Sequence, residues 1–265
     1  MHTPPRLHVI QADSRPFTIH AASRSLAFDA ADDTEARMRA VNGGSLVHAW
    51  DHWSLSVVTN RLKCRRLGVA HHARAILPEH HVDRHVTWGK IRVLLDFLHE
   101  RPDADIVAFI DSDAFIRDEV AFGALAEALW AAPDRHGALS RDPLLPKNTY
   151  INTGCLIVKN TAFTRDFLSA VWNDVEARPQ YRHDWPHEQF AASAFVRDHR
   201  DRFFVCRTAV LNTPCGSIVR HAWWKHQFAD IADEELRATV AREVCPDLAT
   251  HAAAPPFDLA ALLDS

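Results

Sequence analysis

Two aspartates, Asp111 and Asp113, stand two residues apart directly after the apolar run at residues 106–110. Such a continuous β-prone run is typical of a strand buried on both faces, and the C-terminal edge of such strands is where α/β sheets bind ligands. Carboxylate oxygens at that edge suit a hard divalent cation, which would bridge the two phosphates of a nucleotide and neutralise the leaving group. The tripeptide alone fits a solvated turn equally well, but apolar segments flank it on both sides and favour the metal site.

Hydrophobic periodicity predicts the elements that would position these acids. Further strands are expected at residues 7–12, 69–77, 138–140, 152–158 and 203–206. Helices are expected at residues 50–67, 87–101, 119–132, 164–177 and 186–196, with Thr87 and Thr164 as N-caps. Strands alternating with helices predict an α/β fold with a mostly parallel central sheet flanked by helices. We expect one domain over residues 1–265, an insertion or flap at residues 20–45 and a C-terminal helical tail at residues 228–265.

The composition is that of an ordinary globular protein, with 265 residues, 47% hydrophobic and 24% charged, and a net charge of −4. No basic field is available for a phosphate backbone, so nucleic-acid binding as the main function is disfavoured. The N-terminal residues show no signal-peptide pattern, and no apolar run approaches the roughly 20 residues that span a bilayer. Because the five cysteines also lack a metal-binding spacing, we expect a protein of the reducing cytoplasm without a transmembrane segment. Its Ala-, Arg- and His-rich usage hints at a bacterial source.

Four short motifs follow one another in an order that is known from an enzyme family. They are Trp-Gly-Lys-Ile at residues 88–91, Asp-Ser-Asp at 111–113, Asn-Thr-Gly at 152–154 and Glu-Gln at 188–189. This ordered set resembles the donor-site region of GT-A fold glycosyltransferases, most of all glycosyltransferase family 34, the galactosyl-, mannosyl- and xylosyltransferases. Residues 56–64 also resemble an early helix motif of the family, Asn-Lys-x-x-Tyr, but here Arg61 replaces the Lys and Cys64 replaces the Tyr. The chain departs again after His221, where Ala-Trp-Trp replaces a glycine-containing segment.

The resemblance implies a metal-dependent glycosyltransferase that moves a sugar from a nucleotide-diphosphate sugar to an unknown acceptor. A UDP-sugar is favoured over a GDP-sugar. The segment formed by Asp111, Ser112 and Asp113 would bind Mn²⁺ or Mg²⁺ together with the donor diphosphate. His221 matches the C-terminal histidine ligand of the family, and a neutral imidazole would complete the metal site. The chain contains 18 histidines, so a coincidental match at this position is the alternative.

Other residues of the donor site also follow from the resemblance. Lys90 would face the nucleotide or its phosphates, and Lys225 would offset phosphate charge. Asn152, Thr153 and Gly154 would line the sugar and acceptor side. The plainer alternatives are a solvated helix lysine at position 90 and a strand start whose asparagine caps a turn at position 152.

Glu188 and Gln189 carry the chemistry that the resemblance implies. Family-34 enzymes retain the anomeric configuration, which requires a nucleophile or a polar group that steadies an oxocarbenium-like state on the far face of the sugar. Glu188 would be that nucleophile or an orienting group, and Gln189 would touch the anomeric region. An acidic residue in a first helical turn is also favoured simply by the helix dipole.

Two other function classes stay open on the sequence. A haloacid-dehalogenase-like phosphatase also places Asp-x-Asp after a buried strand, although this chain has no late Gly-Asp-x-x-x-Asp run. A non-catalytic nucleotide-sugar-binding domain would keep the same motifs. The histidines at positions 80, 81 and 85 resemble a metal cluster by spacing, but we expect an exposed loop there. Stacking of Trp185, Trp223 or Trp224 against an acceptor sugar is a further hypothesis.

Overall fold

The computed structural model describes residues 4–15, 18–21, 24–27, 52–142, 150–222 and 229–244. Its centre is a six-stranded sheet in the order β4-β1-β5-β8-β7-β9. The strands are β1 (Leu7–Asp13), β4 (Ala70–Ala75), β5 (Ile106–Asp111), β7 (Gly137–Arg141), β8 (Ile151–Lys159) and β9 (Phe203–Cys206). The β1–β4, β1–β5 and β7–β9 pairs are parallel, whereas β8 is antiparallel to β5 and β7.

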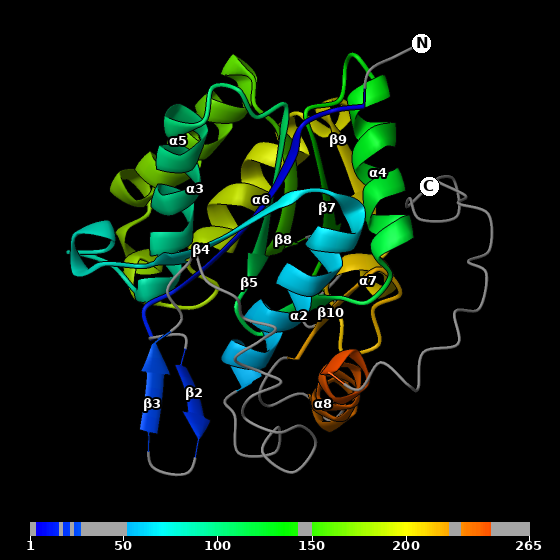
Figure 1. Cartoon of the computed structure of the whole chain (residues 1–265). Helices are drawn as coiled ribbons and strands as arrows, with labels where there is room; N and C mark the ends of the chain where they lie inside the picture. Colours follow the sequence, from blue (N-terminus) through cyan, green and yellow to red (C-terminus); the bar gives the residue numbers. More distant parts are fainter. Residues whose placement is uncertain are drawn as a thin grey trace.

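Helices cover both faces of this sheet (Figure 1). One face packs against α3 (Gly89–Glu100), α5 (Ala162–Ala177) and α6 (Glu188–Asp198). The other packs against α2 (His52–Leu67), α4 (Glu119–Ala131) and α7 (Thr208–Leu211). Strand β5 serves both layers, because Val107 and Phe109 join one apolar core while Ile106, Ala108 and Ile110 join the other. The predicted α/β fold with a mostly parallel, helix-flanked sheet is therefore confirmed.

Two small antiparallel sheets lie beside the central one. Strand β6 (Ala114–Ile116) pairs with β10 (Val219–His221), and neither strand was predicted from the sequence. Strands β2 (Thr18–Ala21) and β3 (Arg24–Ala27) form the other pair. Most of the predicted flap at residues 20–45 lies outside the described residues.

The two predicted N-caps are wrong. A 3-10 turn, Val86–Trp88, precedes α3, so Thr87 lies in that turn and Trp88 occupies the N-cap position without a side-chain hydrogen bond. Helix α5 is capped by Thr161, whose hydroxyl accepts a hydrogen bond from the Thr164 backbone N–H at 3.3 Å. Two threonines three residues apart both fit a cap, and the extended backbone of Thr161 decides between them.

The last described helix, α8 (Ala229–Val244), falls within the predicted C-terminal tail, of which residues 245–265 lie outside the described part. It packs along α2, and its Glu235 forms ion pairs with Arg220 on β10 and with Arg117, the residue that follows β6. The Glu235 carboxylate lies 2.9 Å from the Arg117 Nε and 2.5 Å from an Arg220 guanidinium nitrogen. Among the described residues, none of the helices combines the length and apolarity needed to cross a membrane.

Candidate metal and donor site

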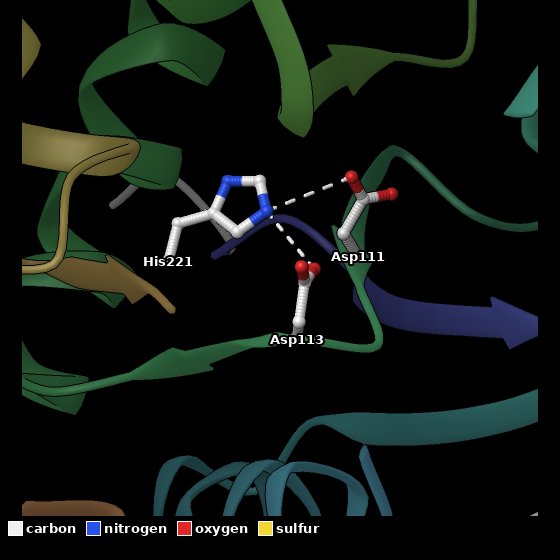
Figure 2. A group of neighbouring side chains, drawn as sticks. All are labelled: Asp111, Asp113 and His221. Atoms are coloured by element: carbon white, nitrogen blue, oxygen red, sulfur yellow. Dashed lines mark hydrogen bonds and ion pairs between the residues drawn. The ribbon is translucent and has the colours of Figure 1, made fainter. Parts of the chain in front are cut away.

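Three side chains from two distant segments meet at the C-terminal end of β5. Asp111 ends that strand, Asp113 follows in the turn to β6, and His221 is the last residue of β10. Figure 2 shows the imidazole facing both carboxylates, with His221 Nε2 2.9 Å from Asp113 Oδ1 and 3.9 Å from Asp111 Oδ2. One ligand atom from each residue can be chosen so that all lie within 4.8 Å of one another. Two carboxylates and one imidazole form a donor set that suits Mn²⁺ and leaves coordination positions for phosphate oxygens.

The β6–β10 pairing brings His221 to the acids. In its register His221 lies opposite Ala114, and the Ala222 N–H donates to the Asp113 carbonyl at 2.8 Å. Gly154 on β8 leaves the space that the imidazole occupies, because a Cβ built there would lie 2.3 Å from His221 Cε1 and 2.6 Å from Nδ1. Position 154 therefore accepts no larger residue while the ring stays in place.

Burial and neighbouring charges give the two acids opposite protonation tendencies. Burial raises the pKa of Asp111, although the Lys90 ammonium opposes this effect. At Asp113 burial acts in the same direction, but the His221 imidazole outweighs it and lowers the pKa to about 2. The His221 pKa is raised, since the Asp113 carboxylate outweighs the desolvation of the ring. A cation bound here would favour the ionised form of both acids, so the site fits a divalent metal chemically.

Lys90 and Glu188 form a buried ion pair next to these ligands. Lys90 Nζ lies 2.8 Å from Asp111 Oδ2 and 3.4 Å from Glu188 Oε1. The Thr153 hydroxyl donates to the same Glu188 oxygen at 2.8 Å. Burial would raise the pKa of Glu188, but Lys90 and Thr153 hold it below its ordinary value. Glu188 is therefore an anion at neutral pH. Lys90 is only 8% exposed, so it is not the solvent-exposed helix lysine that the sequence left as an alternative.

Two buried oxygens at the start of α6 lack a partner within the described part of the chain. They are Glu188 Oε2 and Gln189 Oε1. Buried polar atoms in native proteins are nearly always paired, so two unpaired oxygens on consecutive residues are candidates for hydrogen bonds to a ligand. By contrast, both ends of the Asn152 amide have a partner: it donates to Asp142 Oδ2 at 3.2 Å and accepts from the Gly154 N–H at 2.8 Å.

The structure thus brings Lys90, Asp111, Asp113, Thr153, Glu188 and His221 into one connected group. Ser112 points elsewhere, since its hydroxyl donates to the Asp13 carboxylate at the end of β1. Lys225, Trp223 and Trp224 lie outside the described residues. Among those described, the histidines at positions 80, 81 and 85 form no metal-binding group.

Two features of the site escaped the sequence-based prediction. Asp13 pairs with Arg15 at 2.6 Å, and that guanidinium stacks 4.0 Å over the Trp53 ring. An acid directly after an apolar run is the same signal that identified Asp111. The second feature is His187, whose ring stacks on His85 at 4.1 Å and whose φ of 56° is rare for a residue other than glycine. No sequence pattern marks that conformation.

No family model matches the chain, and no curated protein matches it. Solved structures do match. A glycosyltransferase involved in the glycosylation of the major capsid of PBCV-1 has a TM-score of 0.56 at 13% identity, over 88% of this chain and 100% of that one. The glycosyltransferase GlyE of Streptococcus pneumoniae TIGR4 has a TM-score of 0.49 at 10% identity, over 92% and 64% of the two chains. The galactosyltransferase LgtC in complex with donor and acceptor sugar analogues has 0.43 at 15%, over 88% and 95%.

At 13% identity the match to the PBCV-1 enzyme is a likeness of fold. It extends over the whole of that chain and over 88% of this one. The resemblance to GT-A fold glycosyltransferases is confirmed at this level: the chain has the fold of a GT-A glycosyltransferase.

Proposed function

We propose that this chain is a metal-dependent glycosyltransferase that moves a sugar from a nucleotide-diphosphate sugar to an acceptor, with retention of the anomeric configuration. One observation carries the proposal. The cluster of Asp111, Asp113 and His221 lies beside the buried Lys90–Glu188 pair, so a cation site adjoins an anionic group at the end of β5. That is the edge of an α/β sheet where ligands bind.

Asp111, Asp113 and His221 would hold Mn²⁺ or Mg²⁺, and the bound cation would neutralise charge that develops on the diphosphate leaving group. Lys90 would add a fixed positive charge at the same place. Its ammonium stays protonated, because Asp111 and Glu188 raise its pKa against the effect of burial. The chain would thereby stabilise the leaving group with charges that need no reorganisation during the reaction.

Glu188 would act on the sugar. Its Oε1 is held by Lys90 and Thr153, whereas Oε2 makes no hydrogen bond of normal geometry among the described residues. The Thr87 hydroxyl is near enough to help lower the Glu188 pKa. A carboxylate fixed through one oxygen can present the other to positive charge growing at the anomeric carbon, either as a nucleophile or as an electrostatic stabiliser. Gln189, with a similarly unpaired Oε1, would orient the sugar beside it.

Uridine as the base, Mn²⁺ rather than Mg²⁺ as the ion, and a cytoplasmic site of action belong to the same proposal. The histidine ligand supports Mn²⁺, because Mg²⁺ favours oxygen ligands. Among the described residues, Cys64, Cys155 and Cys215 are free thiols, which supports a reducing compartment.

A mass-spectrometric screen of nucleotide sugars, with Mn²⁺ present and absent, tests the proposal. We expect Mn²⁺-dependent release of a nucleoside diphosphate from one donor, and its loss in Asp113→Asn at an unchanged melting temperature. NMR of the glycoside should show the donor's anomeric configuration, and an inverted product would contradict retention. Phosphate release from phosphomonoesters would favour a phosphatase, and donor binding without turnover would favour a binding domain.

A further inference from the structure

Three buried polar side chains lie directly beneath the turn that carries the two aspartates. They are Gln11 on β1 and Ser56 and Asn60 on α2, and each is 0% exposed. Their polar atoms are directed at the backbone of that turn rather than at its carboxylates. Gln11 Nε2 lies 3.1 Å from the Asp111 carbonyl oxygen and 3.3 Å from the Ala114 carbonyl oxygen. Asp111 and Ala114 are the first and last residues of the turn.

The Ala114 carbonyl accepts a hydrogen bond from each of the three side chains. The Ser56 hydroxyl donates to it, and Asn60 Nδ2 donates to it at 3.1 Å. The other end of the Asn60 amide accepts the Ile116 N–H at 2.7 Å. Strand β6 pairs with β10 along one edge, so Ser56 and Asn60 supply along the other edge the hydrogen bonds that a neighbouring strand would otherwise make.

His71 on β4 fixes the direction in which the Gln11 amide points. Its Nε2 lies 3.0 Å from Gln11 Oε1, and burial lowers the His71 pKa to about 3, so the ring is neutral. A carbonyl oxygen only accepts, so His71 Nε2 carries the proton and Gln11 turns its NH₂ group toward the Asp111 and Ala114 carbonyls. Strand β1 and helix α2 thus hold one four-residue turn by direct hydrogen bonds, and β4 contributes through the contact of His71 with Gln11.

We propose that Gln11, Ser56 and Asn60 are positioning residues that hold the backbone of residues 111–114 and thereby set the affinity of the metal site. This inference rests on the proposed function, since it concerns the same cation. Asp111 and Asp113 lie on a turn pinned at both ends, so their separation is fixed before a cation binds. Residues that orient metal ligands in this way typically contribute about 10- to 100-fold to metal affinity.

The test is calorimetric titration of the full chain with Mn²⁺ alone. Asn60→Asp replaces the donor at Ala114 with an acceptor at equal size, and Gln11→Met removes the amide at similar length. We expect each to raise the Kd for Mn²⁺ about tenfold. Ser56→Ala, which removes one hydroxyl, should raise it less and carries the test if a larger change prevents folding.

Asn160→Asp is the matched control. Asn160 also donates its amide to two main-chain carbonyls, those of Leu98 at 3.2 Å and Arg101 at 3.0 Å. Asn160 follows Lys159, which pairs with Ile106, the first residue of β5. It therefore lies at the end of β5 opposite to Asp111. This variant should keep the wild-type Kd even where its melting temperature falls.

Three results would overturn the inference, and they are distinguishable. If the wild-type chain binds Mn²⁺ and Asn60→Asp, Gln11→Met and Ser56→Ala all bind it with the same Kd, the positioning role is wrong and the proposed metal site stands. If the wild-type chain binds no Mn²⁺, the proposed metal site is wrong and the positioning role falls with it. A loss of affinity in Asn160→Asp equal to that in Asn60→Asp would show a general effect of stability.

Discussion

His221 and Gly154 depend on each other although they lie on different sheets. The imidazole fills the volume that any side chain at position 154 would need, with 2.3 Å between its Cε1 and the Cβ of such a residue. The glycine is therefore required by a close approach and not by its backbone conformation. The sequence resemblance placed Gly154 on the sugar side, whereas the structure gives it a contact with a candidate metal ligand.

Gly154→Ala should displace the His221 ring and weaken Mn²⁺ binding by tenfold or more, about 1.4 kcal/mol. Calorimetry with Mn²⁺ measures this directly. Gly123→Ala is the control, because a Cβ there would meet only the flexible tip of Leu67, at 3.3 Å. Unchanged Mn²⁺ affinity in Gly154→Ala would show that the ring can move aside without loss, and that His221 is no ligand.

Glu188→Gln keeps the size of the side chain and removes its negative charge. If the carboxylate stabilises charge on the sugar mainly in the transition state, kcat should fall by about 10²-fold while KM for the donor changes little. Steady-state kinetics on the donor found in the screen separates the two constants. Glu100→Gln, a half-exposed helix position paired with Arg74, should leave both unchanged. A rise in KM at constant kcat would assign Glu188 to donor binding instead.

At the scale of elements, strong local patterns were predictable and weak ones were not. The run at residues 106–110 is apolar at every position, and it forms the central strand β5 as expected. Strands β6 and β10 have three residues each, too few to show a period, and they exist because each pairs with the other. His221 was therefore found through the family motif, while its route to Asp113 through β10 was not predictable.

The position of the α5 N-cap gives an element-scale prediction. Thr161→Ala removes the hydroxyl that accepts the Thr164 N–H, so the free energy of unfolding should fall by about 1 kcal/mol. Urea denaturation measures it. Mn²⁺ affinity should stay unchanged, because Thr161 follows Lys159, which pairs with Ile106 at the end of β5 opposite to Asp111. If the free energy of unfolding is the same in wild type and Thr161→Ala, Thr161 is not the N-cap, and Thr164, which the sequence favoured, would be the cap.

Over the whole molecule, the site joins parts of the chain that are remote in sequence. Asp113 and His221 are 108 residues apart, and Gln11 and Ser56 add contacts from β1 and α2. The fold class followed from the order of strands and helices, but this convergence depends on tertiary pairing that no local pattern encodes. A cation held by both segments would therefore act on the stability of the entire domain.

Mn²⁺ should raise the melting temperature of the full chain. A ligand that binds only the folded state at a hundred times its Kd adds about 2.7 kcal/mol, which is about 5–10 °C for a domain of this size. Mg²⁺ should give a smaller shift because one ligand is an imidazole, and a chelator should reverse both. Thermal denaturation of wild type and His221→Ala at equal Mn²⁺ concentration is the measurement. We expect the variant to lose most of the shift, since without the imidazole only the 111–113 segment would hold the cation; a shift of wild-type size in His221→Ala would mean that Mn²⁺ binds elsewhere.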